Sequence, residues 1–397
     1  MNLETGLQSL MIVSVVSAAA PFVTAFLGRL RIPQVVVLIV GGVLIGPEAA
    51  GLAEPEEIEL FANVGLGFLF LLAGYEIELD HFRERAGRLA VTGWFVSAAV
   101  SVLVTGLLAA AGLVHAYVPV ALALTTTALG TLLPILRDNE MLVGPLGRFV
   151  MPAGAVGEFL PIVGIAVFLG SEGRLQGLIS LVVTVGVALA LVWIPRLASL
   201  ARFKAIAEEG EHSTSQTTLR LTVMLLLGLL LFASHEGLDV VLGAFLAGVV
   251  LRRWAPGDVD ALEEKLDAVG YGVFIPIFFV SSGMGVDIDS IAEAPGRLLA
   301  LFVLLLVVRG LPSLVIYRHD LAMRERVQMM LLTATALPLL VALAAIGLDT
   351  GHMLPENAAA LVGAGVLSVI VFPGLAVALN RTTRVSDRDE ETPPARS

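Results

Sequence analysis

Thirteen apolar segments, most of them about as long as a membrane crossing, follow one another along this chain of 397 residues. A helix needs roughly 20 apolar residues to cross the hydrocarbon core of a bilayer. Glycine, proline and charged residues gather between the segments. We therefore predict an all-α integral membrane protein of about thirteen transmembrane helices. The predicted spans are 7–27, 32–46, 58–75, 89–113, 117–136, 147–169, 175–195, 217–235, 238–252, 267–283, 298–317, 327–347 and 357–379.

Composition excludes several other classes of protein. Hydrophobic residues make up 57% of the chain and charged residues only 15%, whereas soluble domains carry about 25% charged residues. The chain has no cysteine and no histidine pair at metal-ligand spacing, so we expect no metal beyond a transported cation and no bound cofactor. No span holds a Ser-His-Asp set or paired carboxylates, so we expect no catalytic residues and no enzyme. The net charge of −11 argues against a nucleic-acid partner.

The distribution of basic residues predicts the topology. If the N-terminus lies outside, all Lys and Arg residues but three fall in inside loops or in the C-terminal tail. The exceptions are Arg174, Arg297 and Arg309. Lysine and arginine collect on the cytoplasmic side of membrane proteins. We therefore predict a multi-pass protein of the cell membrane, with its N-terminus outside and its C-terminus in the cytoplasm.

Two pairs of segments suggest that the chain is built twice. Residues 125–129 read Thr-Thr-Thr-Ala-Leu, and residues 333–337 read Thr-Ala-Thr-Ala-Leu, 208 positions later. Residues 35–44 match residues 241–250 at an offset of 206. The copies are seven places apart in the series of spans, and because this number is odd, the copies cross in opposite directions. Inverted repeats of this kind are typical of secondary transporters, although chance similarity among apolar helices is the alternative for either pair alone.

Both threonine-rich segments are followed by a proline, Pro134 and Pro338. Proline removes a backbone donor and disfavours a continuous helix, and threonine hydroxyls can satisfy the backbone groups that are freed. We predict helix breaks at these two places. Their half-helix ends and unwound carbonyls would offer partial charges and oxygen ligands to a small cation. An ordinary proline kink is the alternative.

Two ionisable residues fall near the centres of their spans, Glu158 and Arg309. A charge there costs roughly 2.5–3.5 kcal/mol on an insertion scale. At the offset of 208 these residues meet Val366 and Ser101, so the scaffold itself does not require the charges. A glutamate in a poorly solvated cavity can hold either a proton or a bare cation, which is what an exchanger needs. Because arginine stays protonated, we predict that Arg309 is a fixed counter-charge.

The chain resembles the cation:proton antiporter-2 family, whose sodium/proton exchanger domain is similar to the membrane part of potassium-efflux antiporters. The resemblance covers nearly all of residues 7–380. It is carried by Leu-Gly-Ala-Phe-Leu-Ala-Gly at 242–248, by Pro-Ile-Phe-Phe-Val-Ser-Ser-Gly-Met at 276–284, and by the stretch 125–161. It implies the sodium/proton antiporter fold, with inverted repeats and two discontinuous crossing helices.

This resemblance also implies a division of the chain. A core domain would move against a dimerisation domain in an elevator-like cycle within a homodimer. The implied regions are a transmembrane antiporter domain at 1–380, core helices at about 86–169 and 296–380, dimerisation helices at about 7–75 and 217–283, a linker helix at about 175–199, and a disordered cytoplasmic tail at 381–397.

Residue by residue, the resemblance implies a binding site for the cation and the proton. Glu158 falls where such proteins usually have the essential aspartate, and Arg309 where relatives carry lysine or arginine. Thr126, Thr127 and Thr335 fall at or near the crossing of the broken helices. The chain departs from the pattern at three places of the site. Glutamate replaces aspartate, Gly157 precedes it, and residues 333–338 stand where many relatives have a Gly-Glu-Phe pattern. One carboxylate without a lysine predicts electroneutral exchange of one cation per proton.

The sequence therefore predicts a secondary active transporter that exchanges Na⁺ or K⁺ for protons by alternating access in a lipid bilayer. Two other readings stay open. A passive cation channel could use the same carboxylate for selectivity. A transport-inactive sensor or partner subunit could keep the fold without proton coupling.

Overall fold

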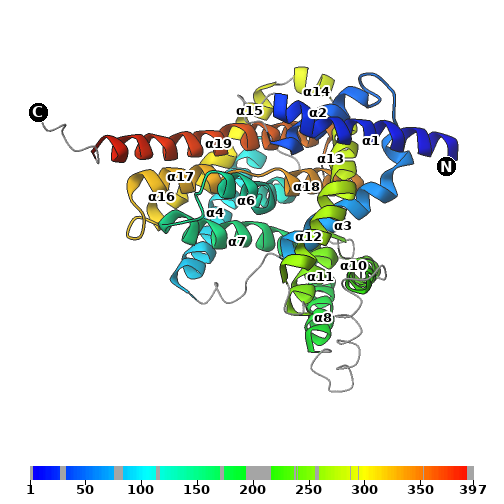
Figure 1. Ribbon diagram of the computed structural model, residues 1–397, viewed down its shortest axis with the longest axis horizontal. Helices are drawn as coiled ribbons and strands as arrows, with labels where there is room; N and C mark the ends of the chain where they lie inside the picture. The colour runs from blue at the N-terminus through cyan, green and yellow to red at the C-terminus, as the bar shows by residue number, and fades with distance from the viewer. Residues whose placement is uncertain are drawn as a thin grey trace, which may run out of the picture. The chain divides into compact units, whose positions relative to one another are not determined.

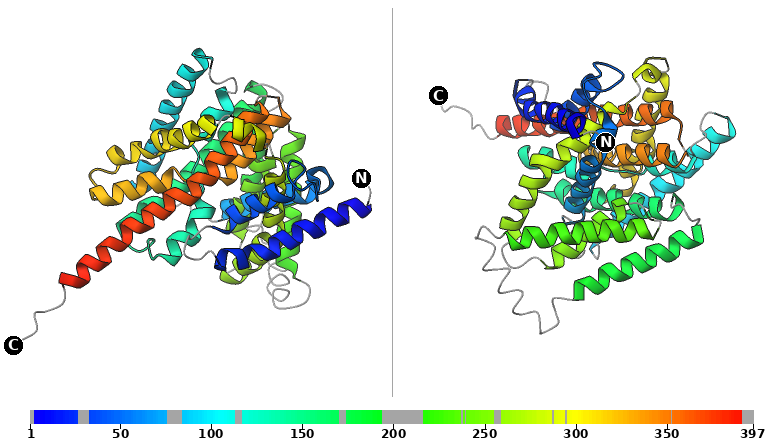
Figure 2. Two further views of the ribbon diagram at one scale, coloured as in Figure 1. Left: turned by 90° about the horizontal axis from the view of Figure 1, so that it is seen from above. Right: turned by 90° about the vertical axis from the view of Figure 1, so that its right-hand side faces the viewer.

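The computed structural model of this protein is helical throughout the residues that it describes (Figures 1 and 2). Every regular element there is an α-, 3-10 or π-helix. The described residues are 3–26, 33–75, 84–112, 117–169, 174–193, 216–236, 238, 240–254, 259–286, 288–293, 295–351 and 353–390.

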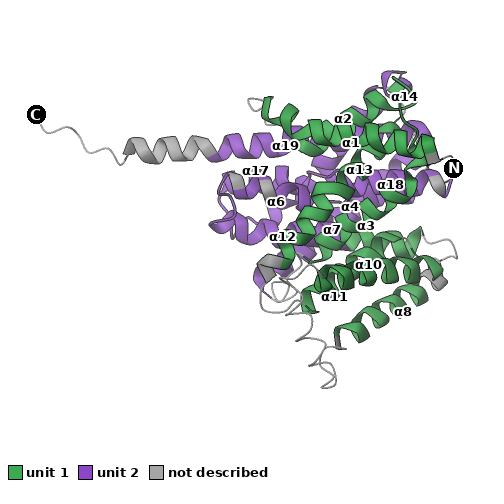
Figure 3. Cartoon of the chain, turned by 45° about the vertical axis from the view of Figure 1, so that its right-hand side comes forward, with its two compact units in different colours: residues 1–27, 34–78, 160–288 green, residues 28–33, 79–159, 289–397 purple. Residues whose placement is uncertain are grey.

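The chain divides into two compact units (Figure 3). Unit 1 comprises residues 1–27, 34–78 and 160–288, and unit 2 comprises residues 28–33, 79–159 and 289–397. Most of the predicted core helices fall in unit 2, but residues 160–169 fall in unit 1. The roles given to the core, dimerisation and linker regions stay predictions, as does the disorder of the tail. Residues 194–199 and 391–397 lie outside the described residues.

Unit 1 holds the helices of three separate stretches of the chain. In order they are α1 (Leu3–Phe26), α2 (Gln34–Ile45), the 3-10 helix η1 (Pro55–Glu57), α3 (Glu59–Tyr75), α8 (Arg174–Trp193), α10 (Thr217–His235), α11 (Val240–Trp254), α12 (Val259–Val269), the π-helix η5 (Gly270–Phe274) and α13 (Ile275–Met284).

Unit 2 holds the remaining helices, which range in length from five to 36 residues. They are α4 (Arg85–Ala110), α5 (Tyr117–Ala123), α6 (Leu129–Asp138), α7 (Pro145–Phe168, whose last nine residues belong to unit 1), α14 (Ile288–Glu293), α15 (Pro295–Leu304), the π-helix η6 (Leu305–Gly310), α16 (Pro312–Ile316), α17 (Met323–Thr333), α18 (Pro338–Asp349) and α19 (Pro355–Glu390).

Eight stretches of helix in the described part of the chain are long and apolar enough to cross a membrane, and three shorter helices are also apolar. Each of the thirteen predicted segments overlaps a described helix. The number of spans itself stays a prediction. Large apolar side chains point outward from these helices, as on α1, where Met11 is 62% exposed and Phe22 is 77% exposed. Such a surface suits lipid better than water.

Glycines allow two pairs of helices in unit 1 to touch at their backbones. On α2, a β-carbon at Gly42 would collide with the carbonyl oxygen of Val280 on α13. On α13, a β-carbon at Gly283 would collide with the carbonyl oxygen of Ile39 on α2. Small residues permit this close approach between membrane helices. The contact between α2 and α13 therefore depends on both glycines.

The second pair, α3 and α11, repeats this contact. A β-carbon at Gly74 would collide with the carbonyl oxygen of Phe245, and one at Gly248 with that of Leu71. Gly248 lies 206 residues after Gly42, and Phe245 lies 206 residues after Ile39. The two contacts are thus made by positions that the sequence offset relates to one another. This is the arrangement that a twofold repeat would produce.

Two helical stretches of unit 2 are interrupted. Between α5 and α6, residues 124–128 leave the helix, and we call these residues the first break. Between α17 and α18, residues 334–337 leave the helix, and we call these the second break. Both interruptions fall within the threonine-rich segments that the sequence singled out. Helices α17, α18 and α19 pack together around the second break.

Candidate functional site

The two breaks of unit 2 are bonded to each other. The backbone N–H of Ala128 donates to the carbonyl oxygen of Thr335 at 2.8 Å. The side-chain hydroxyl of Thr127 donates to the carbonyl oxygen of Thr333 at 2.7 Å. Segments more than 200 residues apart in sequence therefore meet at their non-helical residues, where backbone groups are not used within a helix.

Threonine hydroxyls hold the ends of the broken helices. Thr126 Oγ1 donates to the carbonyl oxygen of Ala123 at 2.8 Å, and Thr335 Oγ1 donates to that of Leu331 at 3.1 Å. These bonds supply hydroxyl donors to carbonyls at the ends of the broken helices, which is the role expected of threonine in a membrane helix. Both side chains are fully buried. Each hydroxyl oxygen that donates its hydrogen keeps lone pairs that can face a cation.

The two prolines occupy different positions relative to the breaks. Pro338 is the first residue of α18 and follows the second break directly. Its missing N–H costs nothing there, because the first residues of a helix have no intrahelical acceptor. Pro134 lies inside α6, beyond the first break rather than at it. The side chain of Pro134 is outside the described part of the structure.

Glu158 lies on α7 with only 5% of its surface exposed, so it does not face lipid. The residue before it is bonded to the first break, because the N–H of Thr127 donates to the carbonyl oxygen of Gly157 at 2.9 Å. A β-carbon at position 157 would lie 2.5 Å from Nη2 of Arg309 and 2.5 Å from Oγ1 of Thr127. A glycine is therefore required beside the carboxylate residue, which explains one departure from the family pattern.

Arg309 lies in the π-helix η6 and is 3% exposed. Its Nε donates to Oγ1 of Thr127 at 2.9 Å, and its Nη2 donates to the carbonyl oxygen of Ala153 on α7 at 2.9 Å. The guanidinium therefore joins η6, the first break and α7. The donors are held by neutral oxygens, so the positive charge stays fixed in the centre of unit 2.

Two serines that the sequence analysis missed serve the second break. Ser313 Oγ lies 3.3 Å from Oγ1 of Thr333, one turn after Arg309. Ser368 on α19 accepts the N–H of Ala336 at 3.1 Å, and its hydroxyl lies 2.9 Å from the carbonyl oxygen of the same residue. The only sequence signal for either serine is a lone polar residue within an apolar span.

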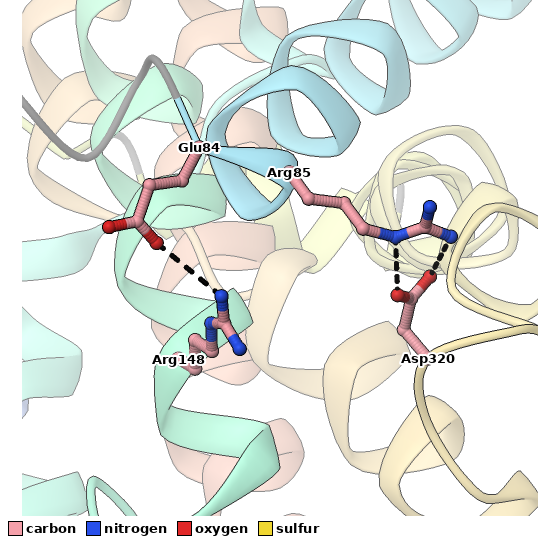
Figure 4. Close-up of polar contacts among 4 residues, drawn as sticks. All are labelled: Glu84, Arg85, Arg148 and Asp320. Atoms are coloured by element: carbon pink, nitrogen blue, oxygen red, sulfur yellow. Dashed lines mark hydrogen bonds and ion pairs between the residues drawn. The ribbon is translucent and has the colours of Figure 1, made fainter.

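Four charged residues of unit 2 form two ion pairs (Figure 4). Arg85 Nε lies 2.6 Å from Oδ1 of Asp320, and its Nη2 lies 3.0 Å from Oδ2. The salt bridge is therefore bidentate. Arg148 Nη2 lies 3.5 Å from Oε2 of Glu84. The hydrogen bond from Arg85 holds the pKa of the Asp320 carboxyl below its usual value. Both pairs are partly exposed, so they connect α4, α7 and the loop before α17 without entering the buried site.

The buried residues thus form one candidate site. It brings together the predicted residues Thr126, Thr127, Thr335 and Arg309 at the two breaks. The turn of α7 that carries Glu158 joins them through the hydrogen bond between Thr127 and Gly157. Among the described residues, no group of three or more His, Cys, Asp or Glu side chains could hold a bound metal. Oxygen atoms and a single carboxylate suit a weakly held monovalent cation.

The family model described as "Sodium/hydrogen exchanger, transmembrane" matches residues 14–379. The chain belongs to the sodium/hydrogen exchanger family. This family, together with its apolar helices, makes it a multi-pass membrane protein. The match covers all residues of the candidate site and agrees with the resemblance found in the sequence.

Several curated relatives carry antiporter names. The putative Na(+)/H(+) antiporter YjbQ of Bacillus subtilis is 26% identical over 93% of this chain and 62% of its own length. The Na(+)/H(+)-K(+) antiporter GerN of Bacillus cereus is 25% identical over 71% of this chain and 72% of its own length. The glutathione-regulated potassium-efflux system protein KefC of Enterobacter is 26% identical over 94% of this chain and 61% of its own length. The chain thus spans less than two thirds of the length of two of these three relatives.

Solved structures share its fold. The sodium proton antiporter MjNhaP1 from Methanocaldococcus jannaschii at pH 8 superimposes with a TM-score of 0.62 over 95% of this chain and 97% of that chain, at 17% identity. A second structure of the same antiporter gives a TM-score of 0.68 at 18% identity, over 99% of this chain and 100% of that chain. The exchanger family assignment and the fold therefore agree.

Proposed function

We propose that this protein exchanges Na⁺ or K⁺ for protons across a cell membrane, and that Glu158 is the group that takes up either ion. The observation that carries the proposal is the burial of this carboxylate residue in a turn that is bonded to the first break. The names of the curated relatives support exchange of Na⁺ or K⁺ for protons.

The proposed cycle rests on competition at one carboxylate. Ionised Glu158 attracts a dehydrated cation, and the oxygens of Thr126, Thr127 and Thr335 complete the site. A proton on the carboxylate removes the charge that held the cation and releases it. One carboxylate that holds either ion carries one cation in one direction for each proton in the other, so exchange is electroneutral. Alternating access then lets each ion leave on the opposite side.

Arg309 acts in this proposal as a constant positive charge. It offsets the carboxylate when no cation is bound, and it does not itself titrate. Because its donors are bonded to Thr127 and to the carbonyl of Ala153, the charge is held in one position at the edge of the proposed cation site. This fixed position supports a counter-charge rather than a proton carrier.

The wider architecture is proposed on the same grounds. We infer thirteen spans in two inverted repeats, with the N-terminus outside and the C-terminus in the cytoplasm. The related glycine contacts of α2 with α13 and of α11 with α3 support the repeat. Unit 2 would be the moving core domain and unit 1 the dimerisation domain of a homodimer with an elevator-like cycle. A polar cytoplasmic tail would follow residue 380.

A liposome experiment tests the exchange. Purified protein is reconstituted with a pH-sensitive dye inside, and Na⁺, K⁺ or Li⁺ is added outside. We expect at least one of these cations to move protons, and Glu158→Gln to abolish that movement. The matched control is Glu56→Gln, at an exposed carboxylate of η1, which should leave exchange unchanged. Full activity of Glu158→Gln would refute the role given to this residue.

The same protein separates the competing functions. Electroneutral exchange produces no current across a planar bilayer, whereas a passive cation channel gives single-channel steps. If no cation moves protons in liposomes in which a known antiporter is active, the sensor or partner-subunit reading replaces the exchanger. A steady current would favour the channel.

A further inference from the structure

The helical stretch formed by α15, η6 and α16 has one exposed, apolar face. It carries four large apolar side chains that are between 42% and 63% exposed, Leu299, Val303, Leu311 and Val315. Arg318 is also exposed and follows Val315 by three residues, so it continues this face beyond the end of α16. From Leu299 to Arg318 a helix rises about 28 Å, close to the roughly 30 Å of hydrocarbon in a bilayer. The face therefore suits lipid chains, and Arg318 lies at the level of the lipid headgroups.

A second arginine is fixed beside this end of the face. Arg326 on α17 donates from Nη1 to the carbonyl oxygen of Leu314 at 2.7 Å. Leu314 lies four residues before Arg318, so its carbonyl points along α16 toward that residue. No other donor of the Arg326 guanidinium is bonded within the described part of the chain, and its Nε is buried. Arg326 is therefore held close to Arg318 with most of its donors unused.

The nearby carboxylates do not neutralise these two arginines. Asp320 pairs through both of its oxygens with Arg85 (Figure 4). Glu325 accepts the backbone N–H of the residue that precedes α17, at 2.9 Å. Among the described residues, neither Arg318 nor Arg326 forms an ion pair. Two positive charges that lie close together without a carboxylate attract an anion to the place between them.

We propose that Arg318 and Arg326 bind the phosphate of an anionic phospholipid, whose acyl chains lie along the exposed face of α15, η6 and α16. Guanidinium groups form strong and often bidentate hydrogen bonds with phosphate oxygens. The ligand is a lipid rather than a soluble anion, because the two arginines lie at the end of an apolar face as long as a bilayer is thick. One arginine near a membrane surface is worth about 1 kcal/mol toward anionic lipid, which is about fivefold in affinity.

Lipid quenching at a single labelled position tests the site in the full-length protein. The chain has no cysteine, so Val315→Cys can carry a fluorophore at the arginine end of the face without background labelling. The protein is reconstituted in vesicles that mix phosphatidylcholine with phosphatidylglycerol, and the acyl chains of one lipid at a time carry bromine, which quenches the fluorophore. We expect phosphatidylglycerol to be enriched at this label. Arg318→Gln and Arg326→Gln should each lower the enrichment about fivefold.

The matched control lies at the other end of the same helical stretch. Leu299→Cys places the label on the same face, near a single exposed arginine, Arg297. This label should report much less enrichment, and Arg297→Gln should not alter the enrichment at position 315. Because Arg318 is exposed, Arg318→Gln decides the question even if Arg326→Gln does not fold. Equal enrichment at the two labels, or an enrichment that Arg318→Gln leaves unchanged, would overturn the site.

Inorganic phosphate distinguishes a lipid from a soluble anion. Added at constant ionic strength, it should leave the enrichment of phosphatidylglycerol in place, and loss of the enrichment would overturn the lipid as the ligand. Quenching by neither brominated lipid would mean that protein, such as a second copy of this chain, covers the face, which would also overturn the proposal. None of these measurements requires transport, so their outcome does not depend on the proposed exchange of ions.

Discussion

Arg309 Nε lies 2.9 Å from Oγ1 of Thr127, and that same hydroxyl donates to the carbonyl oxygen of Thr333. This threonine side chain of the first break thus connects a buried guanidinium to the last residue of α17, which directly precedes the second break. Hydrogen bonds to a charged donor are shorter and stronger than neutral ones. The orientation of Arg309 and the contact between the breaks therefore depend on each other.

Two replacements of Arg309 should distinguish the effect of its charge from the effect of its hydrogen-bond geometry. Arg309→Lys keeps a positive charge but cannot reach both Thr127 Oγ1 and the carbonyl oxygen of Ala153, whereas Arg309→Gln loses the charge as well. We expect both variants to exchange more slowly, with Gln the slower, and to unfold at lower temperature in detergent. Each lost bond to a charged group is worth about 1.5–3 kcal/mol. A lysine variant as active as the parent would contradict a positional role for the guanidinium.

Removing the hydroxyl of Thr127 should loosen the same contact. Thr127→Val keeps the shape of the side chain but leaves the Thr333 carbonyl and Arg309 Nε without their partner. We expect a loss of about 1–3 kcal/mol in the free energy of unfolding, measured by thermal or denaturant unfolding in detergent. Thr127→Ser retains the hydroxyl and should stay close to the parent. Equal stability of the Val and Ser variants would show that the hydroxyl bonds are unimportant.

Gly42→Ala should destabilise unit 1, because its added methyl group meets the carbonyl oxygen of Val280. Overpacking of this kind typically costs about 1–3 kcal/mol. The control is Gly228→Ala on α10, where an added β-carbon meets nothing within 4 Å and where alanine favours a helix by up to about 1 kcal/mol. Melting temperatures of the two variants should therefore move in opposite directions. A neutral Gly42→Ala would mean that α2 and α13 can separate freely.

The pair between Arg85 and Asp320 should make stability depend on acid pH. The folded pKa of Asp320 lies below its ordinary value of 3.8, chiefly because of the hydrogen bond from Arg85. The stabilisation is therefore complete above pH 3.8 and is lost as the pH falls through the folded pKa. Its size is small, since the pair is exposed.

The corresponding measurement is a pH series of melting temperatures. Asp320→Asn should melt lower than the parent near neutral pH, and the difference should shrink in acid below pH 3.8. Asp289→Asn, at an exposed aspartate of α14, provides the comparison for loss of one surface charge. A constant difference at every pH would rule out the ion pair as its source.

The sequence was most informative at positions where a residue type is energetically unfavourable in its surroundings. Charges within apolar spans stand out, so Glu158 and Arg309 were found at once, and the structure buries both. Threonine clusters signalled the breaks because their hydroxyls can replace lost backbone bonds. Proline was a weaker guide, since Pro338 begins α18 whereas Pro134 continues α6.

Other parts of the site had no usable signal in one sequence. Ser313 and Ser368 are single serines in apolar spans, where such residues are common, and only the folded chain brings them to the second break. Arg309 donates to the backbone carbonyl of Ala153, and because every residue has such a carbonyl, the sequence does not indicate this contact. The π-helical form of residues 305–310 depends on packing that local sequence does not encode.

The hydrogen bond from Ala128 to Thr335 restricts how the two breaks can move relative to each other. In an apolar medium, breaking a hydrogen bond between an amide and a carbonyl costs about 4–6 kcal/mol unless water replaces the lost partner. Separating the broken helices would add this cost to the barrier of every turnover. A fast transporter with this architecture should therefore move the two broken helices together as one rigid body. Access of ions to the site would then be opened and closed by other parts of the protein.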